Sequence, residues 1–157
     1  MILDSLWGEG NAVAIVAGDK DLVSVRSVFP GSGTVAVARL DGSVMPDEGS
    51  VFDAFYWSLC FPEYFGWNWD ALSDCLRDLG WIPADRYVLL IDHAEMLLRD
   101  EPEGRKLLFS ILRRAADQWA DPRTSRRHKA IPFKVIFVCA EADMDRLREE
   151  VEIARQA

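Results

Sequence analysis

Residues 61–76 read FPEYFGWNWDALSDCL, and they combine a tight loop with the start of a helix. Pro62 ends any helix that precedes it, and Gly66 gives the backbone the freedom that such a loop needs. Asn68 belongs to the residue types that cap helix N-termini, so we expect a helix that begins beside it and stops before Gly80. The stretch therefore predicts a loop that leads directly into an exposed helical turn.

Two acidic residues of this helix lie four positions apart. Asp70 and Asp74 project from the same helical face, where like charges repel by about 0.2–0.5 kcal/mol when no cation is near. A helix that keeps such a pair is suited to a cationic partner, although similar pairs also decorate ordinary solvated helices. The opposite side carries residues that we expect in the core, namely Ala71, Leu72, Cys75 and Leu76.

Strand-like and helix-like segments alternate on both sides of this stretch. Short apolar runs predict strands at residues 11–17, 22–29, 34–40, 87–91 and 133–139. Spacing and capping residues predict helices at 48–60 (capped by Asp47), 68–79, 103–119 and 143–155, with a helical turn near 93–99. We therefore expect an α/β fold whose core is a three-stranded parallel sheet packed with helices. The hairpin of the first two strands is expected to extend this sheet at an edge and make it mixed.

The helix predicted over 103–119 has the clearest amphipathic pattern. Its apolar residues recur at helical spacing, as expected for a helix that covers a sheet, and they are Leu107, Leu108, Ile111, Leu112 and Ala115. The length of 157 residues fits one domain.

The net charge of −8 is unevenly distributed along the chain. Residues 41–103 hold fourteen acidic and three basic residues, a net charge of −11, whereas residues 104–134 hold nine basic and two acidic residues, a net charge of +7. The acidic segment repels phosphates and attracts a cationic partner, so we expect no nucleic-acid binding. The basic run 123–129 lacks interleaved aromatic residues and is expected to be a solvated loop.

The sequence does not support a membrane-spanning or an exported protein. No apolar run approaches the roughly 18 residues of a membrane-spanning helix. Residues 1–5 also lack the basic start and apolar core of a secretory signal, so we expect a cytoplasmic protein without a membrane partner.

Cysteine and histidine chemistry is equally unsupported. Cys60, Cys75 and Cys139 have apolar neighbours and are expected to be small buried residues rather than a disulfide framework or zinc site. His93 and His128 lie far apart without companion ligands in the sequence. We therefore expect no metal, no cofactor and no catalytic residues.

The stretch 61–76 closely resembles the signature of the barstar family, the intracellular protein inhibitors of secreted microbial ribonucleases. The matching elements are Pro62-Glu63-Tyr64, the aromatic Phe65, Gly66, Asn68, Asp70-Ala71-Leu72, Asp74-Cys75-Leu76 and, after a two-residue insertion, Gly80-Trp81. The resemblance covers about residues 34–140, including the order of strands and helices, and implies a small barstar-like layered fold. Residues 1–33 and the helix over about 143–155 look like additions to it.

The resemblance also implies a function. Members of the family plug the active site of a basic ribonuclease, so the implied partner is a basic extracellular ribonuclease or related toxin in a 1:1 complex. The protein would then be an immunity protein or antitoxin and not an enzyme. By resemblance, Asp74 would be the main phosphate mimic, Asp70 a second acidic contact and Tyr64 a packing contact, while Gly66 and Asn68 would bring loop backbone to the enzyme.

Three residues depart from the family pattern. Ser73 stands where the type member has an aromatic residue, Arg114 stands where it presents a further acid, and Arg77 adds a positive charge one turn after Ser73. A basic residue on this face repels an arginine-rich enzyme unless the docking differs. A different ribonuclease, or a toxin of another kind, is therefore also open as the target.

Two tryptophans flank Asn68 within the motif. Large amphipathic aromatic residues in exposed loops often anchor a partner, and they complete a core at least as often. We expect Trp67 to be exposed and Trp69 to be buried. The candidate partner-binding residues are then Tyr64, Gly66, Trp67, Asn68, Asp70, Ser73, Asp74, Arg77 and Trp81.

Two other classes of function stay open on the residues alone. Asp70 and Asp74 could bind a divalent metal or act as an acid/base pair, although no nucleophile or third orienting group accompanies them. The chain could also be an acidic module that binds a basic regulatory partner. Tight inhibition of a ribonuclease, metal-dependent turnover, or binding without inhibition would separate the three.

Overall fold

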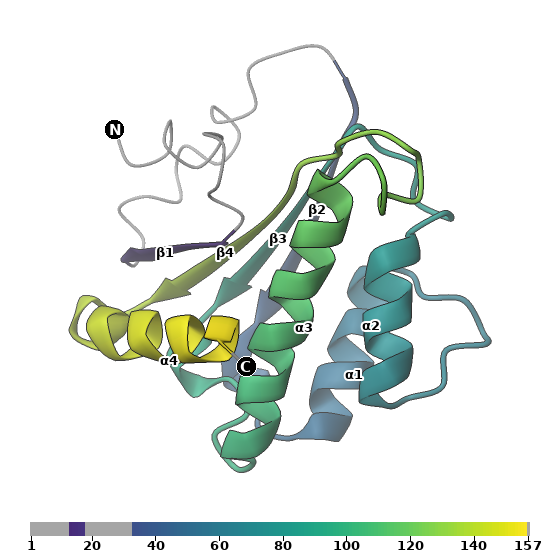
Figure 1. Ribbon diagram of the computed structural model, residues 1–157. Coiled ribbons are helices and arrows are strands. Elements are labelled where there is room, and N and C mark those ends of the chain that lie inside the picture. The colour runs from purple at the N-terminus through teal and green to yellow at the C-terminus, as the bar shows by residue number, and fades with distance from the viewer. Residues whose placement is uncertain (1–12, 18–32, 157) are drawn as a thin grey trace.

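The computed structural model describes residues 13–17 and 33–156. Strands and helices alternate within these ranges, and short turns of 3-10 helix follow β2, β3 and β4 at Gly42–Val44, Ala94–Met96 and Glu141–Asp143 (Figure 1). The order of the longer elements is β1 (Val13–Ala17), β2 (Val35–Asp41), α1 (Glu48–Ser58), α2 (Trp69–Asp78), β3 (Arg86–Asp92), α3 (Pro102–Ala120), β4 (Phe133–Cys139) and α4 (Met144–Gln156).

The described strands form one sheet in the order β1-β4-β3-β2. Every pairing is parallel, with Val13 opposite Val135 and Ile91 opposite Phe137. The predicted α/β class and parallel sheet are confirmed, but the count of three strands is wrong because β1 joins β4 as a fourth parallel strand. The described sheet is therefore not mixed, and the expected returning strand at 22–29 lies outside the described residues.

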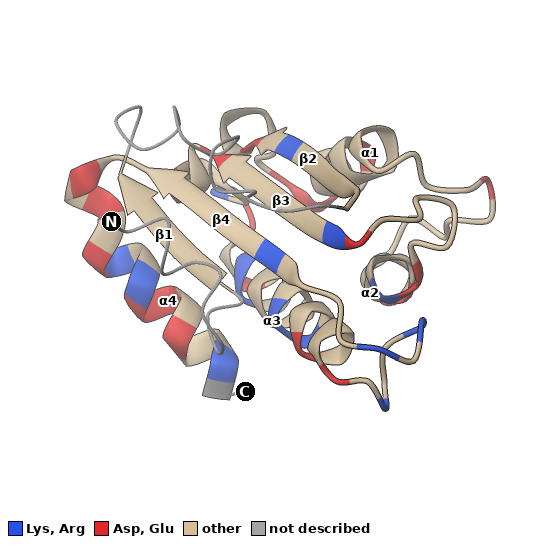
Figure 2. Ribbon diagram, turned by 90° about the horizontal axis from the view of Figure 1, so that it is seen from above, with Lys and Arg blue, Asp and Glu red and all other residues tan. Residues whose placement is uncertain are grey.

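The helices α1, α2, α3 and α4 lie on one side of the sheet (Figures 1 and 2). The main core fills the space between this face and the helices, and its fully buried side chains include Phe55, Leu72, Leu76, Leu112, Trp119 and Phe137. The opposite face of the sheet also carries a buried apolar cluster, made of Val16, Val88, Leu90, Ile136 and Val138. Strands β3 and β4 are thus buried on both faces, which explains their almost continuous apolar sequence.

Helix boundaries follow capping residues and, at one end, core packing. Asp47 caps α1 as predicted, because its carboxylate accepts from Ser50 N at 2.9 Å while Ser50 Oγ accepts from Asp47 N at 3.1 Å. At the end of α2, Leu79 and not Gly80 adopts the left-handed conformation (φ 47°). Its side chain is fully buried, so apolar burial outweighs the usual preference for glycine there.

Exposure departs from the sequence prediction at two apolar positions. Leu108, Ile111, Leu112 and Ala115 of α3 are buried, but Leu107 is exposed because it lies about 100° around the helix from Leu108. Cys60 is also exposed, whereas Cys75 and Cys139 are buried as expected. Within the described ranges, no helix is both long and apolar enough to cross a bilayer.

Candidate protein-binding surface

Buried aromatic side chains hold the loop between α1 and α2 in place. The rings of Phe61 and Phe65 are buried with centroids 4.9 Å apart, and Phe65 N donates to Pro62 O at 3.0 Å to close a turn. Trp81 is half-buried, and its Nε1 donates to Leu59 O at 2.9 Å. Trp81 therefore supports the loop from within the protein, which is a structural role that the sequence did not reveal.

Gly66 allows a close approach rather than an unusual backbone angle. A Cβ atom at this position would lie 3.3 Å from both Ala71 Cβ and Asn68 Nδ2. The left-handed conformation falls instead on Trp67, with φ 55°. The expectation of backbone freedom at Gly66 is thus corrected to a requirement for a small residue.

Asn68 caps α2 as the sequence predicts. Its Oδ1 accepts from Ala71 N at 2.8 Å, and its Nδ2 donates to Gly66 O at 3.1 Å. The side chain therefore holds the helix start and the preceding turn together. This arrangement places Asp70 in the exposed first turn of α2.

The two predicted carboxylates lie on the outer side of α2. Asp70 and Asp74 are both exposed, while Leu72, Cys75 and Leu76 are buried in the core. Ala71, also expected in the core, is only half-buried and packs at its edge. Burial, together with the nearby charges of Asp78 and Asp74, raises the pKa of the Cys75 thiol to about 11. The rotation of the helix is therefore the one predicted from the sequence.

The acidic side of α2 already contains cations. Arg77 Nη2 lies 2.6 Å from Asp74 Oδ1, and Arg77 Nε donates to Ser73 O at 3.2 Å. Asp78, one turn after Asp74, lies 3.4 Å from Nε of Arg126, which belongs to the basic loop beside α2 (Figure 2). Asp74 is therefore already paired with a cation of the protein itself, on the face where the sequence places Arg77. Ser73 is buried, so its side chain offers almost no surface to a partner.

Three large aromatic side chains are exposed around this loop. Tyr64 is 71% exposed, Trp57 71% and Trp67 47%, which confirms the expected exposure of Trp67. The ring of Tyr56 connects α1 to the loop, because its centroid lies 5.3 Å from Trp57 and 4.8 Å from Trp67. Trp57 and Trp67 thus both lie against Tyr56, and exposed apolar side chains that gather in this way often mark interaction sites.

The motif did not reveal Trp57, although the helical pattern of α1 contains a signal for it. The buried residues of α1 are Val51, Phe52 and Phe55. Trp57 lies two positions after Phe55, about 200° around the helix, and therefore on the outer side.

Trp69 is only partly buried, so its expected burial is half right. Its Nε1 donates to Glu48 Oε1 at 3.0 Å, and its ring meets Phe52 edge-on at 4.9 Å. Trp69 therefore connects the start of α2 to the start of α1.

The basic loop at 121–130, which was expected to be solvated, also contacts the interior of the protein. The guanidinium of Arg127 donates to Ala84 O and, at 2.6 Å, to Tyr87 Oη, and it lies 5.8 Å from the ring centroid of Trp119. Arg127 thereby anchors the loop to the core, a role for which the sequence carries no local signal. Arg114, the departure on α3, is exposed as its position in the helical pattern requires.

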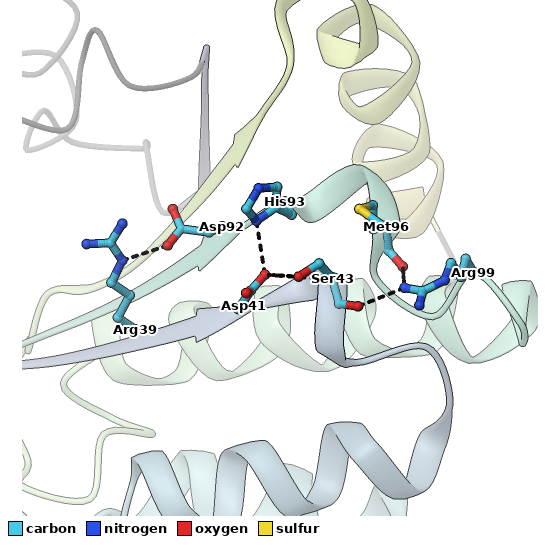
Figure 3. Close-up of polar contacts among 7 residues, drawn as sticks. All are labelled: Arg39, Asp41, Ser43, Asp92, His93, Met96 and Arg99. Atoms are coloured by element: carbon cyan, nitrogen blue, oxygen red, sulfur yellow. Dashed lines mark hydrogen bonds and ion pairs between the residues drawn. The ribbon is translucent and has the colours of Figure 1, made fainter.

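A second polar cluster lies at the carboxyl ends of β2 and β3 (Figure 3). Ser43 Oγ donates to Asp41 Oδ1 at 2.7 Å, and His93 Nδ1 lies 3.0 Å from the same oxygen. The hydrogen bond from Ser43 holds the pKa of the Asp41 carboxyl below its usual range. The Ser43 hydroxyl is thus engaged by the Asp41 carboxylate. In the described part of the chain, no three His, Cys, Asp or Glu side chains are grouped to hold a metal ion.

Comparison with known proteins agrees with the geometry of α2 and its loop. A family model described as Barstar (barnase inhibitor) matches residues 35–138. The chain belongs to the barstar family. The matched span starts with β2 and reaches into β4, so it contains α1, α2 and α3, while β1 and α4 lie outside it. A search of the curated proteins finds no match.

Membership of the barstar family confirms the resemblance carried by residues 61–76. The family implies binding of a ribonuclease such as barnase, and its members are inhibitors rather than enzymes. Within this family framework, the exposed carboxylates of α2 and the aromatic loop form the candidate binding surface.

Proposed function

We propose that this protein inhibits a basic ribonuclease by covering its active site with the outer side of α2 and the preceding loop. One observation carries the proposal: within the family motif, Asp70 and Asp74 are both exposed on the outer side of α2. Carboxylates placed in this way can replace RNA phosphates among the cationic side chains of an enzyme. Tyr64 and Trp67 would add apolar contact area beside them.

The proposed contact between Asp74 and the ribonuclease requires Arg77 to move away from Asp74. Its ion pair with Asp74 has to open before a cation of the partner can take the same carboxylate. Exposed ion pairs are worth only about 0.2–1 kcal/mol, so a cluster of partner cations is sufficient to displace Arg77.

The basic residues on this side of the protein restrict which ribonuclease it can bind. Arg77 and the exposed Arg114 disfavour an enzyme that is cationic over its whole docking surface. We therefore propose a basic extracellular ribonuclease, bound 1:1, whose surface is less basic opposite α3. A toxin domain of another kind is the second candidate, and an immunity or antitoxin role follows for either target.

The proposal is tested by titrating a panel of basic microbial ribonucleases with the protein while RNA cleavage is followed. We expect stoichiometric inhibition of at least one enzyme, and its loss in the double variant Asp70→Asn/Asp74→Asn. The matched control is Asp145→Asn/Glu149→Gln, which removes two exposed carboxylates at the same spacing from α4.

Three outcomes would distinguish the proposed function from its alternatives. Inhibition that survives the α2 variant but not the α4 variant contradicts the proposed surface. Binding of a basic protein without inhibition would support the interaction-module alternative. Metal-dependent RNA turnover by the protein alone would overturn inhibition as its function.

A further inference from the structure

A cavity of about 380 Å³ lies between the start of α3, the segment after β3 and helix α4. It is remote in sequence from the motif at 61–76, and one of its walls is α4, which lies outside the matched family span. Its volume falls within the range of pockets that hold small molecules. The lining residues are Glu95, Leu98, Arg99, Pro102, Arg105, Lys106, Arg146, Glu150 and Ile153.

The charge of this cavity is opposite to that of the whole protein. Its lining contains four basic and two acidic side chains, a net charge of +2 in a chain of net charge −8. Lys106 lies 3.7 Å from Glu103, and Arg146 lies 3.0 Å from Asp143 and 3.9 Å from Glu150; these acids are exposed or half-buried. Such surface pairs are weak, so both cations can turn toward a bound anion.

A buried arginine forms part of the cavity wall. Arg105 is only 9% exposed, and its Nε lies 2.6 Å from Glu150 Oε2. Its Nη1 donates to the backbone oxygens of Glu95 and Leu97 at 2.9 and 3.2 Å. Neither its Nη2 nor its Nε, despite the closeness of Glu150, makes a hydrogen bond within the described part of the chain. A buried donor without a partner is uncommon in folded proteins and calls for an acceptor.

An acceptor without a partner lies on the same cavity. Oε2 of Glu95 is buried and receives no hydrogen bond from the described residues. Arg105 Nη2 needs an acceptor and Glu95 Oε2 needs a donor. A ligand that carries an oxyanion beside a hydroxyl group can supply both.

The start of α3 and the apolar side chains of the lining indicate what else a ligand of this cavity would need. Pro102 is the first residue of α3, and Glu101, the preceding residue, makes no side-chain cap among the described residues. The positive end of the helix dipole lies at this wall of the cavity, where Glu103 in the first turn offsets part of it. Pro102 and the half-exposed Ile153 supply an apolar surface next to the charges.

We propose that this cavity binds a small hydroxylated organic acid with a compact apolar body. Its carboxylate is held by Arg105 with support from Arg146 and Lys106, and its hydroxyl group donates to Glu95. The apolar body lies against Pro102 and Ile153. The site does not depend on the ribonuclease-binding surface, so it gives the protein a second, separate ligand.

The test is a titration of the full chain followed by ¹H–¹⁵N NMR, with 3-phenyllactate as the probe. We expect saturable shifts of amide signals in the first turn of α3 and on α4. 3-Phenylpropionate, which lacks the hydroxyl group, is expected to bind at least about fivefold more weakly. Inorganic phosphate, which lacks the apolar body, is expected to bind more weakly still.

Two arginine variants give a matched comparison on α4. Arg146 lines the cavity and Arg148 does not, although their side chains are 58% and 60% exposed and each pairs with the acid three positions before it. Arg146→Glu should weaken 3-phenyllactate binding by about tenfold or more, and Arg148→Glu should leave it within about twofold. Arg146 also lies 3.9 Å from Glu150, the partner of Arg105, so the melting temperature of both variants is measured to check that the fold is kept.

Two results would overturn the proposal. One is an absence of saturable shifts, or shifts that are the same in the Arg146→Glu and Arg148→Glu proteins. The other is equal binding of phosphate and 3-phenyllactate, which would reduce the site to an unspecific anion site. Neither result depends on whether the protein inhibits a ribonuclease.

Discussion

Replacement of Arg77 by glutamine tests whether Arg77 competes with the partner's cations for the Asp74 carboxylate. In the free protein, Arg77 Nη2 lies 2.6 Å from Asp74 Oδ1, with side chains that are 32% and 72% exposed. Exposed pairs of this kind contribute about 0.2–1 kcal/mol, so Arg77→Gln should lower the free energy of unfolding by that amount. In the parent protein the pair has to open on binding, which costs this same free energy. The Arg77→Gln protein does not have this cost, so it should bind the ribonuclease about 1.4-fold to fivefold more tightly.

The variant is measured in two ways. Chemical denaturation reports the free energy of unfolding, and binding kinetics with the ribonuclease found in the inhibition titration report the affinity. Arg155→Gln is the control, because it also removes one positive charge and one exposed pair, that with Glu152 at 3.8 Å on α4. It should lower stability slightly and leave affinity nearly unchanged. Unchanged or weaker binding of the Arg77→Gln protein, relative to this control, would refute the role of Arg77 as a competitor for Asp74.

Three further results are expected from the same structure. Under native conditions a thiol reagent should modify the exposed Cys60 quickly and Cys75 slowly, because burial raises the pKa of the Cys75 thiol to about 11; fast labelling of Cys75 would contradict the rotation of α2. Asn68→Ala should lower the free energy of unfolding by about 1 kcal/mol, since α2 loses its cap, and an unchanged midpoint in urea would contradict this. The pKa of Asp41 is lowered in the folded state, so its stabilising contribution is present above the unfolded value near 3.8 and is lost as the pH falls through the lower folded value. Ser43→Ala should therefore flatten the loss of stability below about pH 4, and an identical acid limb would count against the hydrogen bond between Ser43 and Asp41.

Local patterns in the sequence predicted most of the elements. The apolar runs and caps give β4 at its observed bounds, and α1 and α2 at their observed starts after Asp47 and Asn68. The exposure of Asp70 and Asp74 follows from helical spacing alone. These features depend on interactions within a few residues, which a sequence displays directly.

Features set by distant contacts were not predictable in the same way. The pairing of β1 with β4 joins residues near opposite ends of the chain, and no local pattern encodes that register. The left-handed conformation of Leu79 and the contacts of the half-buried Arg127 likewise depend on the core against which they pack. The pair of Arg77 with Asp74 was available from its spacing, since residues three apart are neighbours on a helix.

The central claim is that Asp74 contacts the partner and does not hold the fold together. The most direct measurement compares melting temperature and ribonuclease affinity for Asp74→Ala. Loss of the pair with Arg77, worth about 0.2–1 kcal/mol, and relief of repulsion from Asp70, worth about 0.2–0.5 kcal/mol, oppose each other, so the melting temperature should change little. Affinity should fall by about 2–5 kcal/mol, or about 30-fold to several thousandfold, a range to which complexes of the barstar family themselves contribute. A protein that melts much earlier, or that binds its ribonuclease as tightly as the parent, would contradict the account.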